Sequence, residues 1–108
     1  MVTRETPSEG IKRVRAEMQI GTQGLGLTSK KVEALRERWN RAAAVVLAAT
    51  RRDSDMSQEV LAGRLGVSRD VVANIEAGRR KIEISDLILI ARALNVDPIE
   101  LFGRVIRW

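Results

Sequence analysis

The stretch from Ser57 to Gly78, SQEVLAGRLGVSRDVVANIEAG, constrains the fold more than any other part of this 108-residue chain. Ser57 and Ser68 are typical helix caps, because a serine hydroxyl accepts hydrogen bonds from the free N–H groups at a helix start. Gly66 stands where a helix ends most easily, in a left-handed residue. The stretch therefore predicts two short helices joined by a tight turn. Apolar residues recur along it at helical spacing, namely Val60, Leu61 and Leu65 and then Val72 and Ile75.

A short turn with a glycine between two such helices is what a helix-turn-helix requires. The stretch resembles the DNA-binding core of the Xre family, the Cro and CI type of helix-turn-helix found in phage repressors. The resemblance covers roughly residues 40–102. It implies an all-α, five-helix, lambda-repressor-like domain that binds double-stranded DNA. The matching residues are Ser57, Gln58, Leu61, Ala62, Leu65, Gly66, Val67, Ser68, Val72, Ile75, Glu76, Gly78, Ala91–Leu94 and Ile99–Phe102.

We expect the DNA-binding domain to occupy residues 29–108, with the helix-turn-helix at residues 57–78. Thr28 or Ser29 is suited to cap its first helix, which is longer than the first helix of the resembling family. The apolar residues that step by three or four along this helix are Val32, Leu35, Trp39, Ala42 or Ala43, and Val46.

Residues 1–28 are expected to form an N-terminal arm. Residues 11–20, IKRVRAEMQI, alternate as a strand does, but one strand is not stable by itself. We therefore favour a flexible, partly disordered basic arm over a single strand that pairs with a second subunit.

Two more helices are expected after the motif. Ser85 is suited to cap the first, and Asn95 to take the left-handed position after it. Asp97 and Pro98 are typical of the cap and first position of the second. The inner face is expected to hold Leu87, Ile90, Ala91 and Leu94 in the first helix, and Ile99, Phe102 and Ile106 in the second.

The composition excludes most catalytic chemistry. The chain has neither cysteine nor histidine, so disulfides, the usual zinc sites and nucleophile–histidine pairs are excluded. It also has no phosphate-binding loop. We therefore expect no enzymatic activity, no cofactor and no metal.

The net charge of +5 points to a polyanionic partner, although charge alone can also serve solubility. Residues 1–52 carry 11 Lys and Arg against 5 Asp and Glu, whereas residues 53–108 carry 8 against 9. DNA binding by the motif thus depends on where a few cations lie. No signal peptide or membrane span is visible, so we expect a cytoplasmic bacterial or phage protein, associated with the nucleoid when bound.

In this fold the second helix of the motif presents its N-terminal residues to base edges in the major groove. Arg69 can bind guanine O6 and N7 together, and Asn74 can bind adenine N6 and N7. Asp70 can accept from cytosine N4, or can instead only complement the positive helix N-terminus. Val71 can contact a thymine methyl.

The expected contacts to the DNA backbone are Gln58, Ser68, Arg79, Arg80 and Lys81. The alternative for the three cations is a solvated surface cluster. The resemblance implies that Gln58 bonds a phosphate and braces Arg69. It also implies an ion pair between Arg51 and Glu76, which we interpret as structural, since losing one partner of a buried pair leaves an uncompensated charge.

One such domain reads only a few base pairs, so useful specificity requires a homodimer on a palindromic operator. The candidate dimer interface consists of Phe102, Val105, Ile106 and Trp108, with Trp39 as a further candidate. Alternatively these residues complete the monomer core, which we favour for Phe102.

The sequence thus predicts a sequence-specific transcriptional regulator, in the first instance a repressor that occludes a promoter. Alternatives with the same fold are the antitoxin of a toxin–antitoxin pair and a restriction–modification controller. A toxin or antirepressor is a possible protein partner through residues 1–28.

Overall fold

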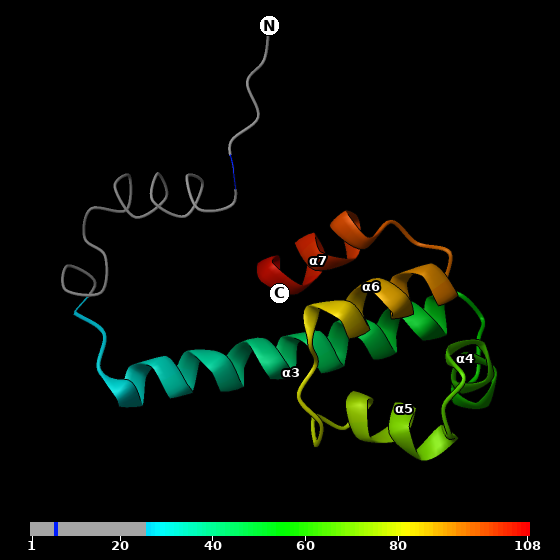
Figure 1. Cartoon of the computed structure of the whole chain (residues 1–108), viewed down its shortest axis with the longest axis horizontal. Coiled ribbons are helices and arrows are strands. Elements are labelled where there is room, and N and C mark those ends of the chain that lie inside the picture. The colour runs from blue at the N-terminus through cyan, green and yellow to red at the C-terminus, as the bar shows by residue number, and fades with distance from the viewer. Residues whose placement is uncertain (1–5, 7–25) are drawn as a thin grey trace, which may run out of the picture. The chain divides into compact units, whose positions relative to one another are not determined.

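The computed structural model describes Thr6 and residues 26–108 of the chain. These residues form five α-helices and no strand, which confirms the predicted all-α class for this part of the molecule (Figure 1). The chain divides into two units, residues 1–34 and residues 35–108. The helices are α3 (Ser29–Asp53), α4 (Gln58–Leu65), α5 (Arg69–Glu76), α6 (Ile84–Ala93) and α7 (Pro98–Arg107).

Little of the predicted N-terminal arm belongs to the described residues. Its alternating stretch, residues 11–20, lies outside them, so the choice between flexible arm and strand stays a prediction. Within the first unit the start of α3 is defined by Thr28, whose hydroxyl accepts a hydrogen bond from the Lys31 backbone N–H at 3.2 Å. The predicted cap is therefore Thr28.

The second unit is built around one aliphatic core to which all five helices contribute. Leu47, Val72 and Leu101 are its largest fully buried side chains. No aromatic residue belongs to this core, because Trp39, Phe102 and Trp108 are 38%, 48% and 52% exposed. The other buried members of this cluster are Ala42, Ala43, Val46, Leu61, Ala62, Ile75, Leu87, Ile90, Ala91, Leu94 and Val105.

The buried face of α3 is shorter than the sequence pattern predicted. Ala42, Ala43 and Val46 are buried as expected, but Leu35 and Trp39 are both more than a third exposed. The reason is length: α3 has 25 residues, whereas α6 and α7 have 10 each. At about 1.5 Å per residue, helices of that size cover less than half of α3.

The first helix of the motif, α4, begins and ends at the capping residues that the sequence predicted. The Ser57 hydroxyl accepts from the Val60 backbone N–H at 3.1 Å, and Gly66 ends α4 with φ +70°. Gly66 is at a conformation that side chains rarely tolerate. Leu61 is buried, but Val60 is 49% exposed and is not part of the apolar face that the spacing indicated.

The cap predicted for α5 is correct in position and wrong in mechanism. Ser68 is the N-cap residue, but its side chain makes no capping hydrogen bond. Its carbonyl oxygen instead accepts from the Val71 N–H at 3.1 Å. The Ser68 hydroxyl therefore makes no hydrogen bond to the free N–H groups at the start of α5.

The cap predicted for α6 was wrong. Glu83, not Ser85, is the N-cap residue, and the Asp86 carboxylate accepts from the Glu83 backbone N–H at 3.0 Å. A carboxylate at the third helical position satisfies the free N–H of the cap, so the helix starts two residues earlier than expected. The predicted inner face of α6 and the left-handed Asn95, with φ +58°, are confirmed.

The cap of α7 was predicted correctly, but its inner face was not. The Asp97 carboxylate accepts from the Ile99 N–H at 2.9 Å, with Pro98 in the first turn. The buried residues are Leu101 and Val105, four apart on one face. The residues expected to be inside lie on another face and are exposed: Ile99 81%, Phe102 48% and Ile106 49%.

Candidate nucleic-acid interface

The orientation of α5 follows from two residues. Val72 and Ile75 are only 2% and 6% exposed and hold the helix against the core. Residues on the opposite side of a helix must then face away from the core. Arg69, Asp70 and Asn74 are exposed there, as predicted for a surface that faces DNA.

Val71, the fourth candidate for a base contact, is placed differently. It is partly buried and packs against the core cluster. Only part of its side chain can therefore reach a thymine methyl.

The guanidinium of Arg69 is unengaged. Within the described residues it forms no hydrogen bond and no ion pair. All five of its N–H donors are consequently available to an external acceptor at the N-terminus of α5.

The ion pair predicted between Arg51 and Glu76 is present and is bidentate. Arg51 Nε lies 2.7 Å from Glu76 Oε2, and Nη2 lies 2.9 Å from Oε1. Both side chains are about nine-tenths buried. Arg51 Nη1 also donates to the Met56 carbonyl oxygen at 2.8 Å, and thereby ties α3 to the turn before the motif.

Gln58 has a different partner from the one the resemblance implied. Its Nε2 donates to Glu76 Oε1 at 3.0 Å, and among the described residues no hydrogen bond joins it to Arg69. The first residue of α4 is thereby tied to the last residue of α5. The two helices of the motif and α3 share one polar cluster, Arg51, Gln58 and Glu76.

The protonation state of Glu76 follows from these contacts. Burial by itself raises the pKa of its carboxyl, but hydrogen bonds from Arg51 and Gln58 outweigh burial, and the pKa lies below its ordinary value of 4.5. The pKa of Arg51 is raised by the hydrogen bond to Glu76. Both groups are therefore charged at neutral pH, and the pair fixes α5 against α3.

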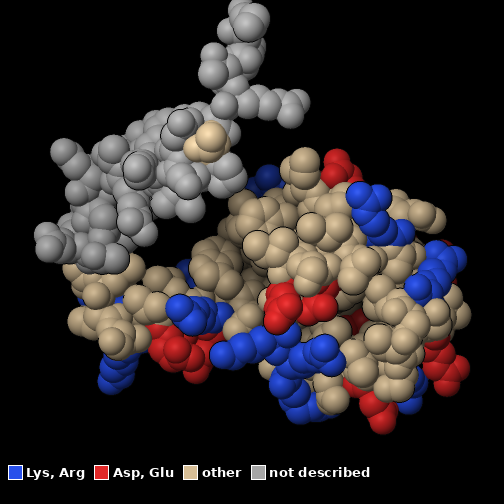
Figure 2. Space-filling view, in the orientation of Figure 1, with Lys and Arg blue, Asp and Glu red and all other residues tan. Residues whose placement is uncertain are grey.

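Three cations follow α5 in the chain. Arg79, Arg80 and Lys81 are all exposed, and basic side chains gather where the loop after α5 lies (Figure 2). Arg79 is distinct from the other two, because its Nε donates to Asn74 Oδ1 at 3.0 Å. The sequence did not predict this contact.

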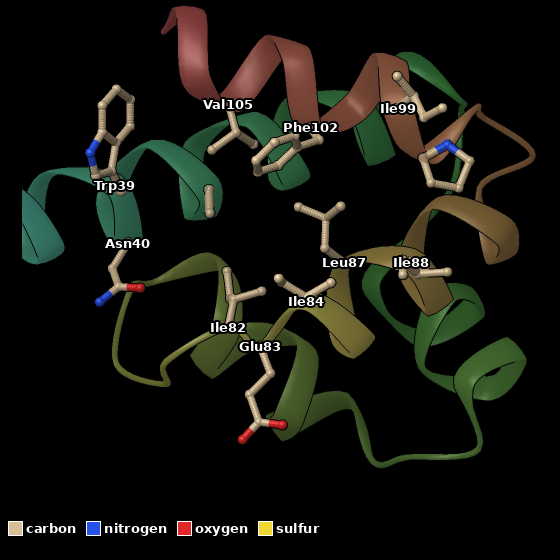
Figure 3. Close-up of a pocket in the computed structure, with 12 residues that line it drawn as sticks. Trp39, Asn40, Ile82, Glu83, Ile84, Leu87, Ile88, Ile99, Phe102 and Val105 are labelled. Carbon is tan, nitrogen blue, oxygen red and sulfur yellow. The ribbon is translucent and has the colours of Figure 1, made fainter. Parts of the chain in front are cut away.

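A second feature of this unit is an apolar groove of about 380 Å³ between α3, α6 and α7 (Figure 3). Its walls include Trp39 from α3, Ile84 and Ile88 from α6, and Ile99 and Phe102 from α7. All five side chains are more than a third exposed. Ile84 and Ile99, at 76% and 81%, were not predicted to lie at an interface.

The residues of the candidate dimer interface fall into two groups. Phe102, Ile106 and Trp108 are about half exposed, whereas Val105 is 5% exposed and belongs to the core. Phe102 is therefore not the core residue that we favoured. Val105 is available to a partner only through the small part of its surface that lines the groove.

Two further classes of site are not found in the described part of the chain. Residue 6 and residues 26–108 hold no group of three or more acidic side chains suited to a metal ion. None of the helices among them is both long and apolar enough to cross a membrane.

An exposed polar face on the second of two short, capped helices defines a helix-turn-helix DNA-binding domain. A family model for helix-turn-helix proteins matches residues 47–101. The chain therefore belongs to the Xre-like, Cro/CI-type helix-turn-helix family, as its motif suggested. A search of curated proteins finds no significant match.

Solved structures agree with this assignment. The wild-type restriction–modification controller protein C.Esp1396I is 28% identical, with a TM-score of 0.60 over 64% of this chain and 88% of the other. A point mutant of that controller gives a TM-score of 0.61 over 64% and 92%. ClgR, the clp gene regulator from C. glutamicum, has the same fold at 20% identity, with a TM-score of 0.61 over 64% and 90%. The chain is a DNA-binding transcriptional regulator.

Proposed function

We propose that this regulator is a repressor that binds a palindromic operator as a homodimer, with α5 in the major groove. The observation that carries the proposal is the exposed polar face of α5, opposite the buried Val72 and Ile75. A recognition helix needs such a face, held rigidly, to present side chains to base edges. Bound over a promoter, the dimer would exclude polymerase sterically.

The base contacts are assigned to the N-terminal half of α5. Arg69, with an unengaged guanidinium, is suited to guanine, whose O6 and N7 accept its two parallel N–H groups. Asp70 is suited to cytosine N4, and Val71 adds apolar contact. Asn74 lies one turn after Asp70 on the same face and completes the set.

Contacts to phosphates are assigned to both ends of the motif. Arg80 and Lys81 are exposed after α5 and supply charge, and Arg79 contributes from the same loop. At the other end, the Ser68 hydroxyl is not used in capping, and Gln58 retains its amide oxygen and one N–H. Such contacts fix register on the duplex without reading sequence.

The homodimer is assigned to the apolar face formed by the groove and the outer stripe of α7, which consists of Ile99, Phe102 and Ile106. Each of five groove side chains exposes on the order of 100 Å², which makes a patch as large as the largest on typical monomers. Ile106 and Trp108 extend it toward the roughly 800 Å² that each partner contributes to a stable interface. A second copy of the chain presents the same apolar face and matches it.

A restriction–modification controller is a second candidate function. It is favoured by the 28% identity to C.Esp1396I over most of that protein's length. No specific observation favours the antitoxin alternative, and the segment expected to bind a toxin, residues 1–28, lies largely outside the described residues. Both candidates keep the DNA-binding face on α5.

Selection of bound sequences from a random duplex pool tests the proposal. We expect an inverted repeat whose half-sites lie about one helical turn, 10 base pairs, apart. Enrichment of a single, non-repeated half-site would contradict the homodimer. No enrichment over unselected DNA would contradict sequence-specific regulation altogether.

A further inference from the structure

Asn74 and Arg79 form a pair on the surface that faces DNA. Arg79 Nε donates to Asn74 Oδ1 at 3.0 Å, and the Arg79 backbone N–H donates to the Asn74 carbonyl oxygen, also at 3.0 Å. Arg79 is thus tied to the same residue of α5 by main chain and side chain.

Gly78 is the residue that makes this double contact possible. Its φ of +74° turns the chain back over the last turn of α5, and its N–H donates to the Ile75 carbonyl oxygen at 3.1 Å. Together with the Arg79 N–H bond to Asn74, this is a Schellman ending of the helix. These two backbone hydrogen bonds fix the position of the Arg79 main chain. The Arg79 side chain therefore starts from a fixed point next to Asn74.

The chemistry of the two groups fixes the orientation of the amide. A guanidinium has only donors, so it can meet only the oxygen of the asparagine amide. Nδ2 and its two N–H groups are then turned away from Arg79. A free asparagine reads adenine with two hydrogen bonds: its Oδ1 accepts from N6, and its Nδ2 donates to N7. The contact with N6 therefore needs Oδ1. Here one lone pair of that oxygen is already taken by Arg79, and the adjacent positive charge makes a second donor such as adenine N6–H₂ less favourable at the other.

We propose that Arg79 is a specificity-determining residue that makes Asn74 read an acceptor edge, guanine O6 and N7, in place of the adenine that an unpaired asparagine favours. Guanine is the base whose major-groove edge offers two acceptors. Asn74 Nδ2 donates to one of these two acceptors, and the positive guanidinium of Arg79 lies close to both. Arg79 then differs in role from Arg80 and Lys81, which contact only phosphate. The inference rests on the proposed function, in which α5 reads bases.

The test is selection from a random duplex pool with the wild type and four variants. Asn74→Ala identifies the base position that Asn74 reads, because preference is lost there. At that position we expect guanine for the wild type. Arg79→Ala should raise the ratio of adenine to guanine selected at that position by about tenfold, which is the discrimination of one good base contact.

Two variants separate the proposed effect of Arg79 on base choice from general electrostatic attraction between the loop cations and DNA. Arg79→Lys supplies a donor to Asn74 Oδ1 and should restore guanine. Arg80→Ala removes an equal charge from the same loop and should lower affinity for all sequences without changing the selected base. Because Arg79 and Arg80 are exposed, we expect wild-type melting temperatures for all three substitutions.

The outcomes distinguish the inference from the proposed function. Adenine selected by the wild type, or an unchanged base for Arg79→Ala, would overturn the inference while leaving the regulator intact. Failure of the wild type to enrich any sequence would overturn the proposed function, and the inference with it.

Discussion

Single residues hold the reading helix in place more firmly than its length would suggest. The helix α5 has only eight residues, too few to be stable alone in water. Val72 and Ile75 bury one side of it, and Glu76 anchors its end to Arg51 and Gln58. The polar face can therefore be exposed without the helix unravelling.

Glu76→Gln should destabilise the protein by about 3 kcal/mol at neutral pH, because it leaves the buried Arg51 guanidinium uncompensated. Chemical denaturation followed by circular dichroism measures this difference. Glu100→Gln is the matched control. Glu100 pairs with Arg104 at 2.9 Å but both are exposed, so its loss should change stability by well under about 1 kcal/mol.

The contribution of Glu76 should also depend on pH in a defined direction. Its folded pKa is lower than the ordinary 4.5, so its stabilisation is complete above that value and is lost as pH falls through the folded pKa. The stability of the wild type should therefore fall more steeply below pH 4.5 than that of Glu76→Gln. Parallel pH profiles for the two proteins would contradict the assignment.

Among the helices, α7 shows what the sequence predicts well and what it does not. Asp97 and Pro98 act within one turn of chain, so the start of α7 could be predicted, as could Ser57 and Gly66 in the motif. The choice of buried face could not, because α7 has two apolar stripes and one polar stripe. These are Leu101 and Val105, then Ile99, Phe102 and Ile106, then Glu100, Arg104 and Arg107.

For α3 and for the candidate nucleic-acid interface, too, the sequence predicts local features but not contacts between distant parts of the chain. The helical period along α3 extends through Leu35 and Trp39, but only the neighbouring helices decide where burial starts. The Arg51–Glu76 pair could be anticipated from the resemblance. The contact between Arg79 and Asn74 could not, because it depends on the turn that Gly78 makes.

A helix with apolar residues on two faces is expected to be covered on both. Ile99→Glu should therefore weaken self-association by at least about 100-fold, since a symmetric interface loses two Ile side chains and each contributes about 1.5–3 kcal/mol. Sedimentation equilibrium measures this change. Ile99 is 81% exposed in the monomer, so its replacement should leave the fold intact.

The control for this experiment lies on the same helix. Glu100→Gln changes the polar stripe and should leave the dimer unaffected. An Ile99→Glu protein that remains as strongly dimeric as the wild type would place the interface elsewhere and leave the outer stripe of α7 unexplained.

At the scale of the whole molecule, charge and reading face are separated along the chain. Residues 53–108, which include the motif, carry 8 basic and 9 acidic side chains. Their affinity for DNA must therefore come from a few placed cations, whereas the basic excess of residues 1–52 is expected to add a general attraction to a polyanion. Specificity and affinity are thus assigned to different residues.

The most direct test of the central claim, that the exposed face of α5 reads base pairs, is to measure binding of Arg69→Ala to the selected operator and to an unrelated duplex. We expect a loss of about 1–3 kcal/mol on the operator and almost none on the unrelated duplex. Arg80→Ala, as the matched control, should weaken both equally. An equal loss on both duplexes for Arg69→Ala would contradict the claim.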